Sequence, residues 1–345
     1  MSAPSAPAHA TPWPIALDDV RAARARLAPF LAPSPLYHHP LLDEAVGHGI
    51  QVLVKHENFL PTNSFKVRNG LSFMTALPEA QRARGVVAAT RGNHGLGIAY
   101  AARAFGVRAT ICVPVGNNPD KNAGMRALGA TVVEAGRDYD ESVVVAQRLV
   151  EAEGMTLAHS TNDRTVLAGA ATLSLELFEQ AATLAPASGS RNAGPDAIVV
   201  VVGGGSQAVG AITVARALAP HARVYAVQAA GASAAHDSWH AGERRTTAAA
   251  STFADGLATR ATYDLTFPAL QAGLAGFVTV TEAQLAHALR LLLRTTHSLA
   301  EGAGAGGLAG LLALAPQLSG QRVAIIVSGG NIDEATLRRV VTHDL

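Results

Sequence analysis

One lysine stands out because its surroundings suit a nucleophilic amine. Lys66 lies at the centre of the run NSFKVRNG (63–70), directly behind Phe65. An apolar run (52–54) precedes it and apolar residues at helical spacing (71–77) follow it, so we expect a strand-to-helix junction. Partial burial there would disfavour the ammonium and lower its pKa, leaving an amine able to form a Schiff base with a carbonyl. A solvated lysine at a helix start is the alternative.

A glycine-rich turn is the second chemical feature. The run VVVVGGGSQAVG (199–210) is typical of a buried strand that breaks into glycines and then opens a helix. Glycines let backbone N–H groups turn inward and the helix N-terminus adds its dipole, so the loop suits a phosphate. A tight turn without a ligand is the alternative, since the spacing fits neither a P-loop nor GxGxxG. A phosphate site and a nucleophilic lysine together indicate a phosphorylated aldehyde, pyridoxal phosphate.

Two further stretches fit that cofactor. TRGNHGLG (90–97) follows an apolar strand and opens a helix, so its backbone donors and the Asn93 amide can hold a carboxylate or a ring hydroxyl. SGGN (328–331) ends the last apolar run, where the Ser328 hydroxyl can hydrogen-bond a pyridine nitrogen. The simpler readings are a helix-cap role for His94 and a plain glycine turn.

The composition bounds the class of protein. At 345 residues the chain is long enough for two domains or one large α/β unit. With 15% charged residues and a net charge of +1, nothing marks a nucleic-acid or membrane partner, and an enzyme with a small-molecule substrate fits best. Cys112, the only cysteine, is expected to be a buried small hydrophobe. Residues 1–14 are predicted to be a disordered tail rather than a signal peptide, and the protein to be cytoplasmic.

The elements that must position these residues alternate regularly from Val86 onward. Strand-like and helix-like segments follow one another, which is the signature of βαβ units and of a parallel sheet covered on both faces. The first series has strands GVVAAT, RATICVP and TVVEAG, with helices at about 93–105, ending at 128 and running through 150. The second has strands DAIVVVV, RVYAVQ and RVAIIVSGG, with helices to about 218, near 282–294 and after 301.

The segment between the two series, 187–196, is predicted to be a surface loop or linker. The lysine segment precedes the first series, so we expect it to join the second series in space.

Six motifs occur in an order and spacing that resembles the fold-type II pyridoxal-phosphate enzymes, specifically the threonine dehydratase and serine racemase group. They are KHENFLPTNSFKVRNG, TRGNHG, GGGS, FADGLA, EGAGA and SGGNID, within residues 36–333. The resemblance implies an α/β fold like that of the tryptophan synthase β chain, with two open, twisted, mainly parallel sheets flanked by helices. It also implies a large domain (15–74 and 163–345), a small domain (75–162) and a homodimer.

The resemblance also implies a role for each site residue. Lys66 would hold the cofactor and act as the catalytic base. The cofactor would also contact Phe65 at the ring face, Asn93 at the ring hydroxyl, Ser328 at the pyridine nitrogen, and Gly203, Gly204, Gly205, Ser206 and Gln207 around the phosphate. The substrate would be bound by Ser64, Thr90, Arg91, Gly92, Asn93 and His94.

Departures from the group's motifs bear on the reaction. Near the cofactor, Asn63 stands where the group usually has Gly or His, and Asn69 and Ser206 each replace a glycine. Arg91 stands where the group usually has a serine that serves the racemases as a second acid/base, and a permanently charged arginine cannot shuttle that proton. Gln228 and Ala234 fall where cation-binding members have carboxylates, so no metal is expected.

The sequence therefore predicts an ammonia-lyase that converts a 3-hydroxy amino acid, of the threonine or serine type or a bulkier one such as phenylserine, to a 2-oxo acid and ammonia. The alternatives are a 3-hydroxyaspartate dehydratase, another fold-type II enzyme such as a racemase or synthase, and a binding protein without catalysis. Arg91 could face solvent, hold the α-carboxylate or contact the substrate side chain. The acid that protonates the leaving hydroxyl stays open between Lys66 and the cofactor phosphate.

Overall fold

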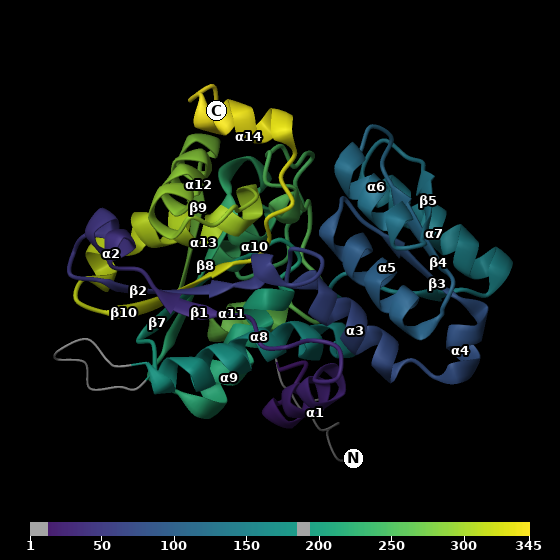
Figure 1. The fold of residues 1–345 in the computed structure, drawn as a ribbon, viewed down its shortest axis with the longest axis horizontal. Coiled ribbons are helices and arrows are strands. Elements are labelled where there is room, and N and C mark those ends of the chain that lie inside the picture. The colour runs from purple at the N-terminus through teal and green to yellow at the C-terminus, as the bar shows by residue number, and fades with distance from the viewer. Residues whose placement is uncertain (1–12, 185–193) are drawn as a thin grey trace, which may run out of the picture.

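The structure, a computed structural model, describes residues 13–184 and 194–345. Its strands form two sheets, which lie side by side in Figure 1. The six-stranded sheet has the order β1 (Leu36–His38), β2 (Gln51–His56), β10 (Arg322–Val327), β7 (Ala197–Val201), β8 (Arg223–Ala229) and β9 (Gly276–Val280). The four-stranded sheet has the order β5 (Thr131–Glu134), β4 (Ala109–Val113), β3 (Val86–Ala89) and β6 (Thr156–Leu157).

Strand pairing is parallel in both sheets except for β1 with β2, which confirms the predicted fold class. β10 shows why the sequence folds in this way, because it is an uninterrupted apolar run. Val323 and Ile325 face one core, whereas Ala324 and Ile326 face the other. Such a strand is stable only where helices cover both faces of the sheet.

Helices cover both faces of each sheet, as Figure 1 shows. One face of the six-stranded sheet carries α1 (Leu17–Leu27), α8 (Arg164–Thr183), α9 (Ser206–Leu218), α10 (Ala234–Ala241) and α11 (Phe267–Gly273). The other carries α2 (Pro40–Val46), α12 (Glu282–Thr296), α13 (Gly302–Leu314) and α14 (Glu334–Val341). The four-stranded sheet is covered by α3 (Lys66–Ala76), α5 (Asn93–Phe105) and α6 (Pro119–Ala127) on one face and α7 (Tyr139–Glu153) on the other, with α4 (Glu79–Arg84) beside it.

The helices predicted from the sequence are confirmed, and their bounds agree closely. The helix expected at 93–105 is α5, and the helix expected to end near 218 is α9. α12 continues two residues beyond the expected end, to Thr296. Cys112 is fully buried without a disulfide partner, as predicted.

Two predictions fall partly on residues that are not described. Residues 1–12 of the predicted tail, and 185–193, which include most of the predicted linker 187–196, lie outside the described residues. The last two tail residues, Trp13 and Pro14, are described: the Arg216 guanidinium lies 3.6 Å from the Trp13 ring centre, and Arg164 donates a hydrogen bond to the Pro14 carbonyl. The domain boundaries stay a prediction. In the described part of the chain, no helix has the length and apolar character needed to cross a membrane.

α3 lies between the two groups of elements (Figure 1), packed on α5 and α8. On the α5 side the two backbones touch, because a Cβ atom added to Gly70 would lie 2.2 Å from the Gly97 carbonyl oxygen. On the α8 side, a Cβ atom added to Gly169 would lie 2.4 Å from the Ser72 Cβ atom. Larger side chains at these glycines would push α3 away from its neighbours.

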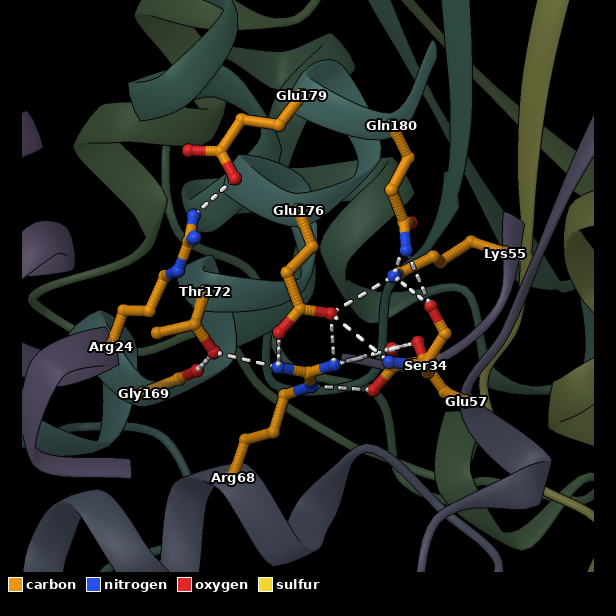
Figure 2. A network of polar contacts seen from close by, with 10 residues as sticks. All are labelled: Arg24, Ser34, Lys55, Glu57, Arg68, Gly169, Thr172, Glu176, Glu179 and Gln180. Carbon is orange, nitrogen blue, oxygen red and sulfur yellow. Dashed lines mark hydrogen bonds and ion pairs between the residues drawn. The ribbon is translucent and has the colours of Figure 1, made fainter. Parts of the chain in front are cut away.

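A buried ionic network also anchors the start of α3 (Figure 2). The Arg68 guanidinium donates to the Glu57 carboxylate from Nε at 2.7 Å and to the Glu176 carboxylate from Nη1 and Nη2, both at 2.7 Å. Lys55 Nζ donates to the same Glu176 at 2.9 Å and to the Ser34 carbonyl at 2.7 Å. Burial would lower the pKa of Arg68, but the two carboxylates outweigh it and raise that pKa. Two cations and two anions thus tie α3 to β2 and α8.

Candidate active site

One cavity brings together segments from both sheets. The cavity is lined by the loops that follow β3 and β7 and by the residue after β10, all at the carboxyl ends of parallel strands. Nearly all of the predicted site residues line it, namely Phe65, Lys66, Thr90, Arg91, Gly92, Asn93, His94, Gly203, Gly204, Gly205, Ser206, Gln207 and Ser328. Ser64 is the exception.

Lys66 is the first residue of α3, as the sequence predicted for a strand-to-helix junction. Its Nζ donates a hydrogen bond to the Ser160 carbonyl at 3.1 Å and lies 5.0 Å from the centre of the Phe65 ring. Burial lowers the pKa of Lys66 to about 8. The neutral, nucleophilic amine is therefore far more populated near neutral pH than it is for a solvated lysine.

Ser64 lies behind Lys66 rather than on the cavity. Its side chain is fully buried, and its Oγ accepts a hydrogen bond from the Lys66 backbone N–H at 3.3 Å. Ser64 also forms a β-bridge with Gly329, and the Phe65 N–H donates to the Ser328 carbonyl at 3.0 Å. These contacts hold the start of the lysine segment against the second series of elements, whereas α3 itself packs on the four-stranded sheet of the first series. They also give Ser64 a role in holding the start of α3.

The glycine loop after β7 can only be built from small residues. A Cβ atom added to Gly203 would lie 2.2 Å from the Gly256 carbonyl oxygen, and one added to Gly204 would lie 2.3 Å from Thr161 Oγ1. Gly205 has a φ of +99°, and α9 starts directly after it. The N–H groups of the first turn of α9 therefore face a site without Cβ atoms, and this arrangement fits an anionic phosphate.

Gln207 borders this loop, and half of its amide is already engaged. Its Oε1 accepts a hydrogen bond from the Val201 N–H at 3.2 Å, whereas its buried Nε2 has no partner among the described residues. An unsatisfied buried donor beside an anion-binding turn is consistent with a missing acceptor such as a phosphate oxygen.

The loop before α5 is held by its own side chains. Thr90 Oγ1 accepts a hydrogen bond from the Gly92 N–H at 2.9 Å. The Asn93 amide donates to Glu301 and accepts from Asn331 Nδ2 at 2.8 Å. One Nδ2 hydrogen of Asn93 is left, which is sufficient for the predicted bond to a ring hydroxyl.

His94 lines the same loop as a neutral ring. Its Nε2 lies 2.8 Å from the Ala158 carbonyl, and because a carbonyl only accepts, Nε2 carries the proton. Burial, with a contribution from Lys66, lowers the pKa of His94 to about 3. Its buried Nδ1 has no partner among the described residues and can only accept a hydrogen bond. A carboxylate bound here would therefore be held by backbone N–H groups rather than by a His94 cation.

Arg91 differs from the other cations around the cavity. Its side chain is half-buried and lines the cavity, yet within residues 13–184 and 194–345 its guanidinium makes no hydrogen bond or ion pair. A permanently charged group in this position can bind an anion that enters the cavity.

Three charged residues that sequence reasoning missed also line the cavity. Lys121 Nζ, at the start of α6, lies 3.0 Å from Asp255 Oδ2 and 3.3 Å from Glu301 Oε2. Burial raises the pKa of Glu301, although Lys121 opposes that shift. Asp255 and Glu301 belong to the motifs FADGLA and EGAGA, to which the sequence analysis assigned no role. The signal for Lys121 was the sequence Asn118–Pro119, which is typical of a helix start and puts Lys121 in the first turn of α6.

Gln228, which the sequence analysis placed at a cation-ligand position of the group, has a structural role in this chain. Its Oε1 accepts hydrogen bonds from the N–H groups of Ala235 at 3.1 Å and His236 at 3.0 Å, so it caps the start of α10. Over the described ranges, no three His, Cys, Asp or Glu residues are grouped to hold a metal ion.

Comparison with known proteins gives consistent matches. The family described as "Pyridoxal-phosphate dependent enzyme" matches residues 27–329. An L-threonine ammonia-lyase of Thermotoga maritima is 34% identical, over 96% of this chain and 79% of that protein. An L-threo-3-hydroxyaspartate ammonia-lyase of Pseudomonas sp is 36% identical, over 91% of this chain and 95% of that protein. The crystal structure of a threonine deaminase from T.th. superimposes with a TM-score of 0.84 and 37% identity, over 92% of this chain and 99% of that one.

Proposed function

Because the chain belongs to the pyridoxal-phosphate dependent enzyme family, we propose that it is an ammonia-lyase that converts a 3-hydroxy amino acid to a 2-oxo acid and ammonia. The predicted cofactor and the predicted fold-type II group are confirmed by the family match and the structural neighbours. The observation that supports the reaction most directly is the position of Lys66, a desolvated amine on a cavity that two helix N-termini also border.

The residues present fit the cofactor. Lys66 supplies the amine for its aldehyde, the Gly203–Gly205 turn with α9 suits its phosphate, and Ser328 lines the same cavity. When bound, pyridoxal phosphate supplies an electron sink that makes the Cα proton of an attached amino acid acidic.

Lys66 is the residue that moves protons in the proposed reaction. Because its pKa is lowered to about 8, a substantial share of the amine is neutral near pH 8, and Nζ can take the Cα proton as a general base. The Cβ–O bond then breaks, and the hydroxyl leaves as water once it gains a proton. The Lys66 ammonium formed in the first step can return that proton. The enamine that is released tautomerises and hydrolyses in water to the 2-oxo acid and ammonia.

The loop before α5 orients the substrate in this proposal. Its backbone N–H groups lie at a positive helix end and are suited to the α-carboxylate. His94 stays neutral, so it adds no competing positive charge beside Lys66. The loop would thereby place the substrate Cα atom near Lys66 Nζ without adding a positive charge next to this amine.

Threonine or serine is the default substrate, supported by the named activities of the relatives. A 3-hydroxyaspartate is the second candidate, since Arg91 lines the cavity and can pair with a second carboxylate, and one relative is named for that substrate. Phenylserine is the third, since a guanidinium can also stack on an aryl ring. The homodimer stays a prediction that sedimentation can measure.

The deciding experiment compares the wild type with Lys66→Ala. We expect the wild type to show a visible absorbance band that borohydride reduction removes, and to release ammonia from at least one 3-hydroxy amino acid. Lys66→Ala should lose the band and the turnover while its circular dichroism is unchanged, because the residue supplies both the covalent link and the base.

The same panel separates the alternatives. Interconversion of enantiomers without ammonia would indicate a racemase, and a product formed only with a second substrate would indicate a synthase. A reducible band without any turnover would indicate a binding protein. Lys66→Ala turnover within tenfold of the wild type would exclude Lys66 as the base.

A further inference from the structure

Two tyrosines line a part of the cavity that has no predicted role. Tyr139 is the first residue of α7, and Tyr263 lies just before α11, so each comes from the neighbourhood of a different sheet. Burial, together with the nearby Tyr139 side chain, raises the pKa of Tyr263. The Tyr263 hydroxyl therefore stays protonated and uncharged.

The tyrosine pair lies beside the reactive amine. Tyr139 Oη is 3.4 Å from Ser160 Oγ, and the Ser160 carbonyl accepts the hydrogen bond from Lys66 Nζ at 3.1 Å. One residue thus contacts both the tyrosine pair and the group that carries the reaction.

Further contacts hold the pair in place. Asp138 Oδ2 lies 3.5 Å from Arg260 Nη2, so an ion pair joins the two segments that carry the tyrosines. The His159 ring meets the Tyr263 ring edge-on with their centres 5.0 Å apart. Held from several sides in this way, the two rings cannot move aside without losing these contacts.

Three parts of the cavity are committed in the proposed reaction. The turn before α9 takes the phosphate, the loop before α5 takes the α-carboxylate, and Ser328 takes the ring nitrogen. The Cα atom must lie next to Lys66 Nζ for proton transfer, so the substituent on Cα lies near the residues that surround this amine. Tyr139 and Tyr263 line the cavity from none of these three parts, and Tyr139 lies beside Lys66 through Ser160.

We propose that Tyr139 and Tyr263 determine specificity by contacting the substrate side chain, accepting hydrogen, methyl or carboxylate on Cβ and excluding an aryl ring. The inference rests on the proposed function, because it takes an amino acid bound next to Lys66. It favours threonine, serine and 3-hydroxyaspartate over phenylserine. Enlarging the site would require displacing the Tyr263 ring from its edge-on contact with His159.

The test measures binding rather than turnover. L-Alanine and L-phenylalanine carry no β-hydroxyl and cannot lose water, so their binding to the holoenzyme can be titrated through the change in the cofactor's visible band. The wild type should bind alanine more tightly than phenylalanine. Tyr139→Ala and Tyr263→Ala should each shift the ratio of the two dissociation constants toward phenylalanine by about tenfold or more, as expected for a pocket that gains space.

Matched controls separate ring volume from polarity and from general damage. Tyr139→Phe and Tyr263→Phe keep the rings and should leave the ratio within about threefold of the wild type. Tyr37→Ala removes a tyrosine that is half exposed on β1, away from the cavity, and should change nothing.

The inference is overturned if the alanine variants keep the visible band but leave the ratio within about threefold of the wild type. If the alanine variants lose the visible band, the same binding ratio is measured with Tyr139→Leu and Tyr263→Leu, which keep apolar volume at these positions. A shift of the ratio toward phenylalanine in the leucine variants supports the inference, and an unchanged ratio overturns it. A wild type that binds both amino acids yet releases no ammonia from any hydroxy amino acid would contradict the ammonia-lyase proposal, and the binding ratio would still test the tyrosines.

Discussion

Burial alone accounts for the lowered pKa of Lys66. Among the described residues, no carboxylate offsets the cost of desolvating its ammonium, and the pKa falls from an ordinary 10.5 to about 8. Between those two values the unfolded chain binds more protons at this position than the folded apoenzyme does. The free energy of unfolding of the apoenzyme therefore gains a contribution as pH rises through this window.

The shift in pKa predicts how cofactor attachment depends on pH. The rate constant for binding of pyridoxal phosphate to the apoenzyme, followed by visible absorbance, should rise up to about pH 8 and then level off, because Lys66 is then neutral. A simple alkylamine reacting with the same reagent is the control, and its rate should keep rising. A protein rate that also climbs steadily to about pH 10, the ordinary range of a lysine, would show that Lys66 is solvated.

Arg91 is the residue for which substitution best distinguishes the candidate substrates. If its guanidinium pairs with a second carboxylate, Arg91→Ser should lower kcat/KM for 3-hydroxyaspartate by roughly 10- to 150-fold, the loss of one charged hydrogen-bonded contact, and leave threonine nearly unchanged. Arg148→Ser, on the exposed side of α7, is the matched control. An equal loss for every substrate would instead place Arg91 on the α-carboxylate, and no loss would place it in solvent.

At the scale of elements, α3 is fixed by two kinds of contact. Its start is tied by the network around Arg68, and its middle rests directly on the backbone of α5 at Gly70 and Gly97. The network contains two positive and two negative groups, so removing any one of them leaves an uncompensated charge in the interior.

Figure 2 contains a matched pair of arginines for testing this anchoring. Arg68 is 1% exposed at its side chain, whereas Arg24, which pairs with Glu179, is 40% exposed. Arg68→Met should lower the free energy of unfolding by about 3–5 kcal/mol, because Glu57 and Glu176 lose their partner. Arg24→Met should cost at most about 1 kcal/mol. Urea denaturation of both holoenzyme variants measures the difference, and similar small losses would mean that the network does not anchor α3.

Across the whole molecule, the parts of the site that are contiguous in the sequence were the predictable ones. The glycines at 203–205 and the start of α5 combine a strand end, a turn and a helix start within a few residues, so local rules suffice. Lys66 was identifiable because Phe65 and its flanking segments indicate burial.

The contacts that join distant segments were not predictable. Lys121 meets Asp255 and Glu301 only because the two sheets lie side by side, and no local pattern encodes that arrangement. The same holds for Tyr139 and Tyr263. The sequence also did not predict that the Ser64 hydroxyl accepts a hydrogen bond from the Lys66 backbone N–H.

The order of strands in the large sheet has a consequence for how this protein matures. β10 (Arg322–Val327) lies between β2 and β7, so the strand at the centre of the sheet leaves the ribosome after the other five. Until then β2 has no parallel neighbour, Ser64 has no Gly329 to pair with, and Lys66 has no enclosed cavity. The nascent chain therefore carries an ordinary lysine at this position. Its reactivity toward aldehydes arises only when this strand inserts, which delays covalent chemistry until the whole sheet has been synthesised.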